Sequence, residues 1–399
     1  MGALGILAFA LAIAASIALH EAGHMFTARA FGMRVRRYFI GFGPTVWSTT
    51  KGHTEYGLAA LPFGGFCDIA GMTAMDPLTP EEEPHAMVNK PAWQRIAVLA
   101  GGIVMNLLIG VVITYFVAVF SGIPNPDADF TPRVGKTVCV ADQVDADTLG
   151  ECSGAGPAGE AGVQVGDTLV ALDGQELEQF GQVRDAVAKQ PGETVRLEVL
   201  RGGETVTLDV PVAEVERIDP ATGERVTQGA VGIVSADAVK QYGPAEAVPA
   251  TFRFTGQMLR ATVDGIASFP AKIPGVVASI FGAERDIEGP VSVIGASRTG
   301  GELVEQNMWS AFWMMLASLN FFLALFNLVP LPPLDGGHIA VVLYEKIRDA
   351  LRRLRGLGPG APANYEKLMP LTYAMAALLL GVGVLVMAAD VVNPVRIFG

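Results

Sequence analysis

The sequence predicts a polytopic α-helical membrane protein with four transmembrane helices, short membrane-associated β-strands and one extracytoplasmic α+β domain. Of its 399 residues, 51% are hydrophobic and only 17% are charged, a balance typical of membrane proteins. Four apolar stretches reach the roughly 20 residues that a helix needs to cross the hydrocarbon core. They cover residues 3–31, 96–120, 308–329 and 371–392.

Lysine and arginine residues predict how the four spans are oriented, because cytoplasmic loops carry an excess of them. They gather in the loops 34–90 and 346–367. We therefore expect both loops on the cytoplasmic side of the cell membrane, and both termini and the large domain outside. Residues 122–250 hold 22 acidic and 9 basic residues in a chain of net charge −12. The negative charge belongs to this outer region and argues against nucleic-acid binding.

The chain divides into four predicted parts. Residues 1–121 hold the first two spans, 130–215 the outer domain, 240–300 an amphipathic segment at the outer surface, and 301–399 the last two spans. After the first span, Gly and Pro residues alternate with aromatic and β-branched ones, which predicts short strands. We expect the helices to shelter these strands inside the membrane, because lipid-exposed sheet edges are not tolerated there.

Local patterns predict several elements of the outer region. Residues 180–190 are typical of a short amphipathic helix, and a hairpin is expected to close at Gly202 and Gly203. Residues 289–301, "GPVSVIGASRTGG", indicate a loop. Cys139 and Cys152 lie in the outer region, where oxidation is permitted. A disulfide between them is expected, with two free buried thiols as the alternative.

The first span ends in "HEAGH", which is an H-E-x-x-H motif made by His20, Glu21 and His24. On a helix the two histidines share one face and can bind one zinc ion, and the glutamate can reach a water bound to it. Ionisable groups inside a membrane cost at least ~2.5–3.5 kcal/mol each and persist mainly where they function. The motif therefore predicts a metal site, with a buried hydrogen-bonded histidine pair as the alternative.

A catalytic zinc needs a third protein ligand and an open position for water. Asp335, in "FNLVPLPPLDGGH", follows the third span at the depth of the two histidines. His53 and His85 lie in polar or mixed loops instead. Prolines break the helix before Asp335, and Gly336 and Gly337 let the backbone turn. Asp335 is the expected third ligand, and an aspartate that merely ends a helix is the alternative.

An H-E-x-x-H motif in the first span, followed by N-x-x-P-x-x-x-L-D-G in a later one, resembles the site-2 protease family of intramembrane zinc metalloproteases. The resemblance runs along the whole chain and includes "GFGP" and "LPFGGF" after the first span. Residues 157–174 are similar to a PDZ module. The pattern is most similar to the actinobacterial Rip1-like proteases, which have one PDZ domain.

The resemblance implies a zinc-dependent endopeptidase that cuts transmembrane segments of other proteins, with one Zn²⁺ per chain. Matched residue by residue, it implies the metal ligands His20, His24 and Asp335, the catalytic acid/base Glu21, and the substrate-binding residues Asn327 and Asn106. The family has a proline three residues before the asparagine that Asn106 matches, and Ile103 takes its place here. A helix-packing role for Asn106 therefore stays open.

The resemblance also implies partners: single-span membrane proteins, such as anti-sigma factors already cut by another protease, and the lipid bilayer. The PDZ-like domain would bind the new C-terminus left by the earlier cut, or it would exclude substrates with bulky outer domains. Its acidic surface favours exclusion. We also hypothesise that a strand from "PFGGF" receives the unwound substrate by strand addition, with proline substitutions at Leu58–Leu61 as the test.

Three other protein classes are alternatives. A protease that trims prenylated proteins would need a glutamate as third ligand and would have no PDZ-like domain. A membrane scaffold that presents a PDZ module would not need an intact metal site. A transporter would distribute its ionisable residues along a pathway, whereas here they share one depth.

Overall fold

The structure is a computed structural model that divides into two units, one built from Met1–Tyr115 and Thr251–Val395 and the other from Phe116–Ala250. It describes residues 2–73, 75–125, 132–144, 150, 152–218, 225–236, 239–283, 285–286, 289–358, 360–361 and 363–395.

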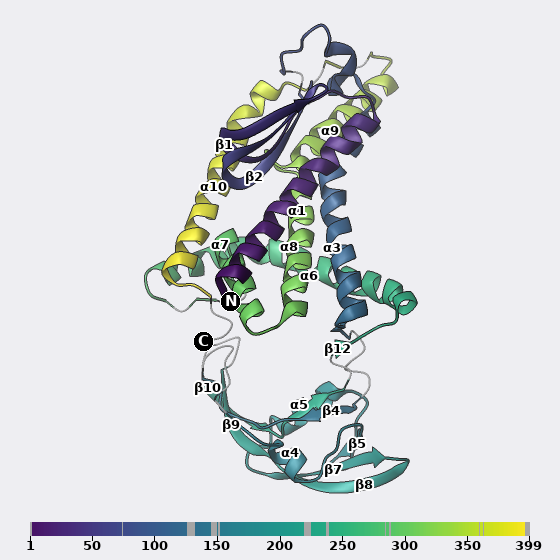
Figure 1. Ribbon diagram of the computed structural model, residues 1–399. Coiled ribbons are helices and arrows are strands. Elements are labelled where there is room, and N and C mark those ends of the chain that lie inside the picture. The colour runs from purple at the N-terminus through teal and green to yellow at the C-terminus, as the bar shows by residue number, and fades with distance from the viewer. Residues whose placement is uncertain are drawn as a thin grey trace. The chain divides into compact units, whose positions relative to one another are not determined.

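Four helices of the described chain are long and apolar enough to cross a membrane (Figure 1), which confirms the four predicted spans. They are α1 (Gly2–Ala30), α3 (Gly101–Phe120), α8 (Trp309–Leu328) and α10 (Met369–Val392). The backbones of α1 and α3 meet at Gly23 and Gly101. A Cβ atom at Gly23 would lie only 2.3 Å from the Gly101 carbonyl oxygen. The crossing therefore requires glycine, and it brings α3 against the H-E-x-x-H turn of α1.

The segment expected to be a loop at 289–301 is mostly helix, so that prediction was wrong. Helix α7 (Val293–Glu305) begins at Ser292, whose side chain accepts a hydrogen bond from the Gly295 N–H group. The helix packs along α1. A Cβ atom at Gly300 would lie 2.5 Å from Cγ of Phe9. The glycines that suggested a loop serve close helix packing instead.

Two long strands, β1 (Val35–Lys51) and β2 (Thr54–Ile69), bend into four paired segments next to α1. Residues 54–59 pair with 45–51 on one side, and residues 55–58 pair with 37–40 on the other. Residues 65–69 then pair with 35–40. Leu58 has partners on both sides, Ile40 and Trp47. The stretch chosen for the proline test therefore begins inside the sheet, and the segment 65–69 forms an edge.

Shorter helices complete the first unit. Between β2 and α3 lie η1 (Glu83–His85), η2 (Met87–Asn89) and α2 (Ala92–Leu99). Between α8 and α10 lie α9 (Asp335–Leu354) and η4 (Tyr365–Lys367). Helix α9 covers part of the segment expected to be a cytoplasmic loop. Helix α6 (Pro244–Ile280) covers most of the segment predicted to be amphipathic, and its last turns pack on α10 through Val276, Val386 and Ala389.

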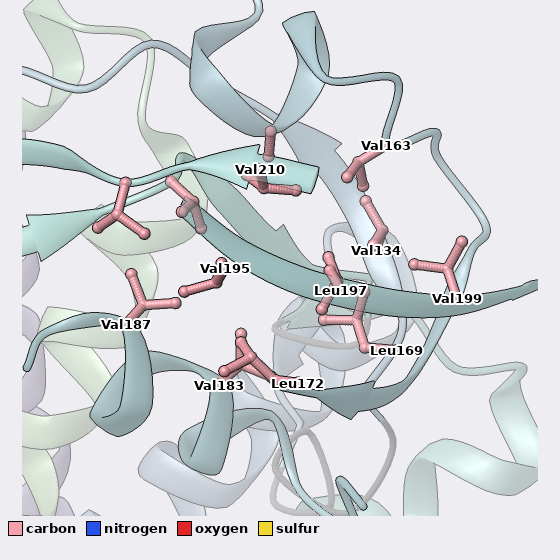
Figure 2. Packing of buried hydrophobic residues seen from close by; sticks show 13 residues of the cluster. Val134, Val163, Leu169, Leu172, Val183, Val187, Val195, Leu197, Val199 and Val210 are labelled. Atoms are coloured by element: carbon pink, nitrogen blue, oxygen red, sulfur yellow. The ribbon is translucent and has the colours of Figure 1, made fainter. Parts of the chain in front are cut away.

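The second unit has its own apolar core, in which valine and leucine side chains from strands and short helices interdigitate (Figure 2). A four-stranded sheet has the order β6-β5-β7-β8. Its longest hairpin closes between Arg201 and Glu204, as predicted, through Gly202 and Gly203, which both have positive φ. Strand β4 pairs with β11, far along the chain, and Cys139 and Cys152 form a disulfide.

The bounds of these elements are β3 (Ile123–Pro124), β4 (Val134–Thr137), α4 (Gly156–Glu160), β5 (Thr168–Leu172), β6 (Gln175–Glu176), α5 (Phe180–Val187), β7 (Thr194–Arg201), β8 (Glu204–Pro211), β9 (Ala213–Ile218), β10 (Arg225–Ala230), β11 (Ile233–Ser235) and β12 (Val239–Lys240).

Candidate metal centre

The two histidines of α1 and one carboxylate from α9 converge on a single point. The Nε2 atoms of His20 and His24 are 3.2 Å apart, and each lies 3.3 Å from Oδ2 of Asp335. These three residues are the one group in the described chain that could hold a metal ion. Asp335 lies far from the histidines in sequence, so this juxtaposition is a property of the fold.

The spacing of the three ligand atoms fits a tetrahedral zinc ion. Ligands at about 2.0–2.1 Å from tetrahedral zinc lie about 3.3 Å from each other, which is the separation observed here. Oδ2 of Asp335 is buried and has no hydrogen-bond partner among the described residues. A buried carboxylate oxygen without a partner is unusual, and a cation at the centre of the triangle would satisfy it. With three protein ligands, a fourth position stays open for water.

A second layer of contacts orients the two imidazoles. Nδ1 of His24 donates a hydrogen bond to the Val98 carbonyl oxygen at 2.8 Å, which leaves Nε2 free to bind a metal. Gly102 on α3 lies against both rings. A Cβ atom there would be 2.4 Å from His24 Nε2 and 2.6 Å from His20 Cε1. The role of Gly102 was not predicted from the sequence, where its signal was the Gly101-Gly102 pair inside an apolar span.

Asp335 is positioned by the first turn of α9. Gly336 and Gly337 follow it, and a Cβ atom at Gly336 would lie 2.3 Å from the Leu328 carbonyl oxygen at the end of α8. This close approach joins the start of α9 to the end of α8. The sequence suggested that the two glycines allow a tight turn. In the structure they let the first turn of α9 lie against the backbone that follows α8.

Glu21 lies beside the metal centre and against the sheet edge. Its carboxylate lies near the backbone N–H group of Cys67. A Cβ atom at Gly65 would lie 3.2 Å from its Cγ atom. The edge segment 65–69 therefore runs next to Glu21. A peptide lying along this edge would also be next to Glu21.

Asn106 is 1% exposed, and neither polar atom of its side chain has a partner among the described residues. It lies one turn after Gly102 on α3, so the two share a face of the helix. An unsatisfied buried amide costs roughly 1–3 kcal/mol per polar group. This arrangement places an unpaired donor and acceptor near the two imidazoles.

Asn327 lies in the last turn of α8, one residue before Leu328, and its side chain is half-buried. Its helix therefore ends beside the turn that carries Asp335. His338, four positions into α9, stacks on Tyr365. Burial lowers the pKa of the His338 imidazole, although the nearby Asp335 carboxylate opposes this shift. His53 and His85 line a different pocket, described below.

Comparisons with known proteins agree with this geometry. The model of "Peptidase family M50" matches residues 8–357. The chain is 49% identical to "Zinc metalloprotease Rip1" of Mycolicibacterium smegmatis over 100% of both chains. It is 44% identical to the protein of the same name from Mycobacterium bovis, over 99% of this chain and 98% of the relative. It is 26% identical to "Regulator of sigma E protease" of Salmonella typhi, over 94% and 95%.

The family model covers most of the sequence, and these relatives align along nearly the whole chain. Both indicate a peptidase, which is the class that the three converging ligand atoms fit. The chain belongs to peptidase family M50.

Proposed function

We propose that His20, His24 and Asp335 hold the catalytic zinc of this protease and that Glu21 is its general acid/base. The chain is a zinc metalloprotease of the site-2 type, which cleaves membrane-embedded segments of other proteins. The observation that carries the residue assignment is the triangle of ligand atoms at 3.2–3.3 Å.

The chemistry divides between the ion and the side chains. Zinc, when bound, lowers the pKa of its water toward ~7 and polarises the scissile carbonyl group. Glu21, which lies next to the edge segment 65–69, takes the proton of the attacking water and later delivers it to the leaving amine. Asn106 has an unpaired amide group that can donate to the oxyanion or to a backbone carbonyl oxygen of the substrate. Asn327, in the last turn of α8, is also proposed to hold the substrate backbone.

Substrate would bind in extended form along the edge segment 65–69. A transmembrane helix hides its peptide groups in its own hydrogen bonds, so it must unwind before cleavage. The free backbone groups of an edge strand replace the lost partners. This edge lies next to Glu21, whereas Leu58 lies inside the sheet. A better test than Leu58–Leu61 is therefore a proline at Phe66, compared with a proline at Val46 on the opposite edge segment.

The protein is a multi-pass membrane protein, and we propose that the metal centre lies toward the cytoplasm with both termini outside. The asymmetry of Lys and Arg between the loops supports this orientation. We further propose that the second unit is a PDZ-like domain on the outer side, and that the substrates are single-span proteins such as anti-sigma factors after a first cut. Relatives that include a regulator of sigma E protease support this substrate class.

The decisive experiment separates metal binding from proton transfer. Glu21→Gln should keep one zinc per chain, measured by elemental analysis, and lower cleavage of a single-span substrate by about 10²–10⁴-fold, the usual contribution of a general acid/base. His24→Ala should lose both zinc and cleavage. Normal cleavage by the Glu21→Gln variant would end the acid/base assignment.

A further inference from the structure

A basic pocket of about 780 Å³ lies at the end of α1 that is remote from the N-terminus. Its lining includes Arg29 in the last turn of α1, Arg34 before β1, Lys51 and His53 at the β1–β2 turn, and His85 in η1. These five side chains come from segments that are separate in sequence, so the fold gathers them into one place. No step of the proposed catalysis uses them.

Most of this positive charge is not neutralised by the residues that the structure describes. Glu81 is the carboxylate residue among the described lining residues, and its side chain is 84% exposed. Its Oε2 atom lies 3.8 Å from Nη1 of Arg34, too far for a hydrogen bond. Within the part of the chain that the structure describes, neither Arg29 nor Lys51 has an ion-pair partner. The pocket therefore presents a net positive charge.

The adjacent basic residues show that this lack of pairing is selective. Arg36 forms ion pairs with Asp76 at 3.0 Å and with Glu82 at 2.7 Å. Arg37 is 2.9 Å from Asp68. Asp68, Asp76 and Glu82 are thus occupied by Arg36 and Arg37, and the pocket residues have no comparable partners among the described residues.

Arg29 is held in place by neutral groups. Its Nη2 atom donates hydrogen bonds to the hydroxyl oxygens of Thr54, at 2.9 Å, and of Tyr56. Thr54 is buried and is itself fixed, because its hydroxyl donates to the Val35 carbonyl oxygen. These contacts orient the guanidinium group but leave its charge intact. The N–H groups on Nε and Nη1 have no acceptor among the described residues and can bind an oxyanion in a forked geometry.

The pocket adjoins an apolar surface of α1. Phe26, three residues before Arg29, is 57% exposed, and Leu19, two turns earlier, is also exposed. Their spacing places them on the face of α1 that ends at Arg29. A phosphate group bound at Arg29 could therefore belong to a molecule whose acyl chains lie along Leu19 and Phe26.

We propose that this pocket binds the phosphate group of an anionic membrane lipid. Basic clusters at the end of a spanning helix attract anionic headgroups, and this cluster adds a preorganised guanidinium group and an adjacent lipid-facing stripe. A bound headgroup would also link the end of α1 to the β1–β2 turn and to η1. The inference does not depend on the proposed catalytic residues.

The test uses the full chain, purified with lipids and examined by native mass spectrometry, with phosphatidylglycerol titrated into phosphatidylcholine. The double variant R34Q/K51Q removes two pocket charges. The control K346Q/R353Q removes two exposed charges from α9, outside the pocket. We expect phosphatidylglycerol binding about thirtyfold weaker in R34Q/K51Q, since each Lys or Arg at such a surface contributes about 1 kcal/mol. The control should bind like the unaltered protein.

Two further measurements keep the result interpretable. Equal melting temperatures of both variants in pure phosphatidylcholine show that the fold is intact. Inorganic phosphate, added at increasing concentration, distinguishes the source of the ligand. Displacement of the lipid by phosphate supports a phosphate subsite. Binding of phosphate without any selective retention of phosphatidylglycerol, or equal lipid binding by R34Q/K51Q and the control, would overturn the proposal.

Discussion

Replacement of Gly102 by alanine should disable the metal centre without unfolding the protein. The added Cβ atom would lie 2.4 Å from His24 Nε2, 2.6 Å from His20 Cε1 and 2.7 Å from His20 Nε2. Carbon atoms in contact are normally about 3.5–4.0 Å from their neighbours, so the imidazoles must move by about 1 Å. Rotation of His24 away from α3 is opposed by the hydrogen bond between its Nδ1 atom and Val98.

The size of this shift sets the expected loss. Ligand distances at a metal site are held to within about 0.2 Å, and a displacement of about 1 Å at a reacting group can cost on the order of 10²-fold in rate. We therefore expect the Gly102→Ala variant to bind zinc substoichiometrically and to cleave at least ~100-fold more slowly. Alanine favours a helix over glycine by up to ~1 kcal/mol, so helix α3 itself should not be weakened.

The assay combines zinc analysis of the purified chain with cleavage of a single-span substrate in membranes. Gly381→Ala in α10 is the matched control, because nothing lies within 4 Å of a Cβ atom built at Gly381. This variant should keep its zinc and its activity. Full zinc occupancy and unchanged cleavage in Gly102→Ala would show that the histidines are not held against α3 as the structure has them.

Three further outcomes are expected. Asp335→Asn should bring bound zinc well below one per chain by elemental analysis, while Asp349→Asn, on the same helix, should keep it. Asn106→Leu should raise the melting temperature, since it removes unsatisfied buried groups worth about 1–3 kcal/mol each, yet it should slow cleavage; a faster or unchanged rate would contradict substrate binding by this amide. In the second unit, hydrogen bonds from Arg201 lower the pKa of Asp167, so the stabilisation is present above the ordinary Asp pKa of about 3.9 and is lost as the pH falls below it. The protection factors of β5 and β7 in the full chain, that is, amide exchange corrected for its intrinsic pH dependence, should therefore fall at low pH and, in Asp167→Asn, already at neutral pH.

Composition and periodicity predicted the elements whose stability is local. The four apolar runs became spanning helices because length and hydropathy alone decide whether a helix can cross a membrane. The Gly202-Gly203 turn was predictable because both positions need positive φ. In each case the deciding interaction lies within a short stretch of chain.

The remaining features depend on partners far away in sequence. Gly300 looks like a loop residue until Phe9 is placed beside it. The bends that turn β1 and β2 into four segments leave Leu58 inside the sheet, and a strand pattern carries no information about which segment becomes an edge. The convergence of His20, His24 and Asp335 was predictable from their motifs. The dependence of both imidazoles on a bare backbone at Gly102 was not, because it arises only where two helices cross.

The assembly of the ligand triangle has a consequence for biosynthesis. His20 and His24 lie on α1, whereas Asp335 follows α8 and is therefore synthesised only after α1, α3 and α8. A partly synthesised chain therefore carries only two of the three ligands. On the proposed ligand set, coordination of a metal by all three side chains therefore becomes possible only after α8 has been synthesised.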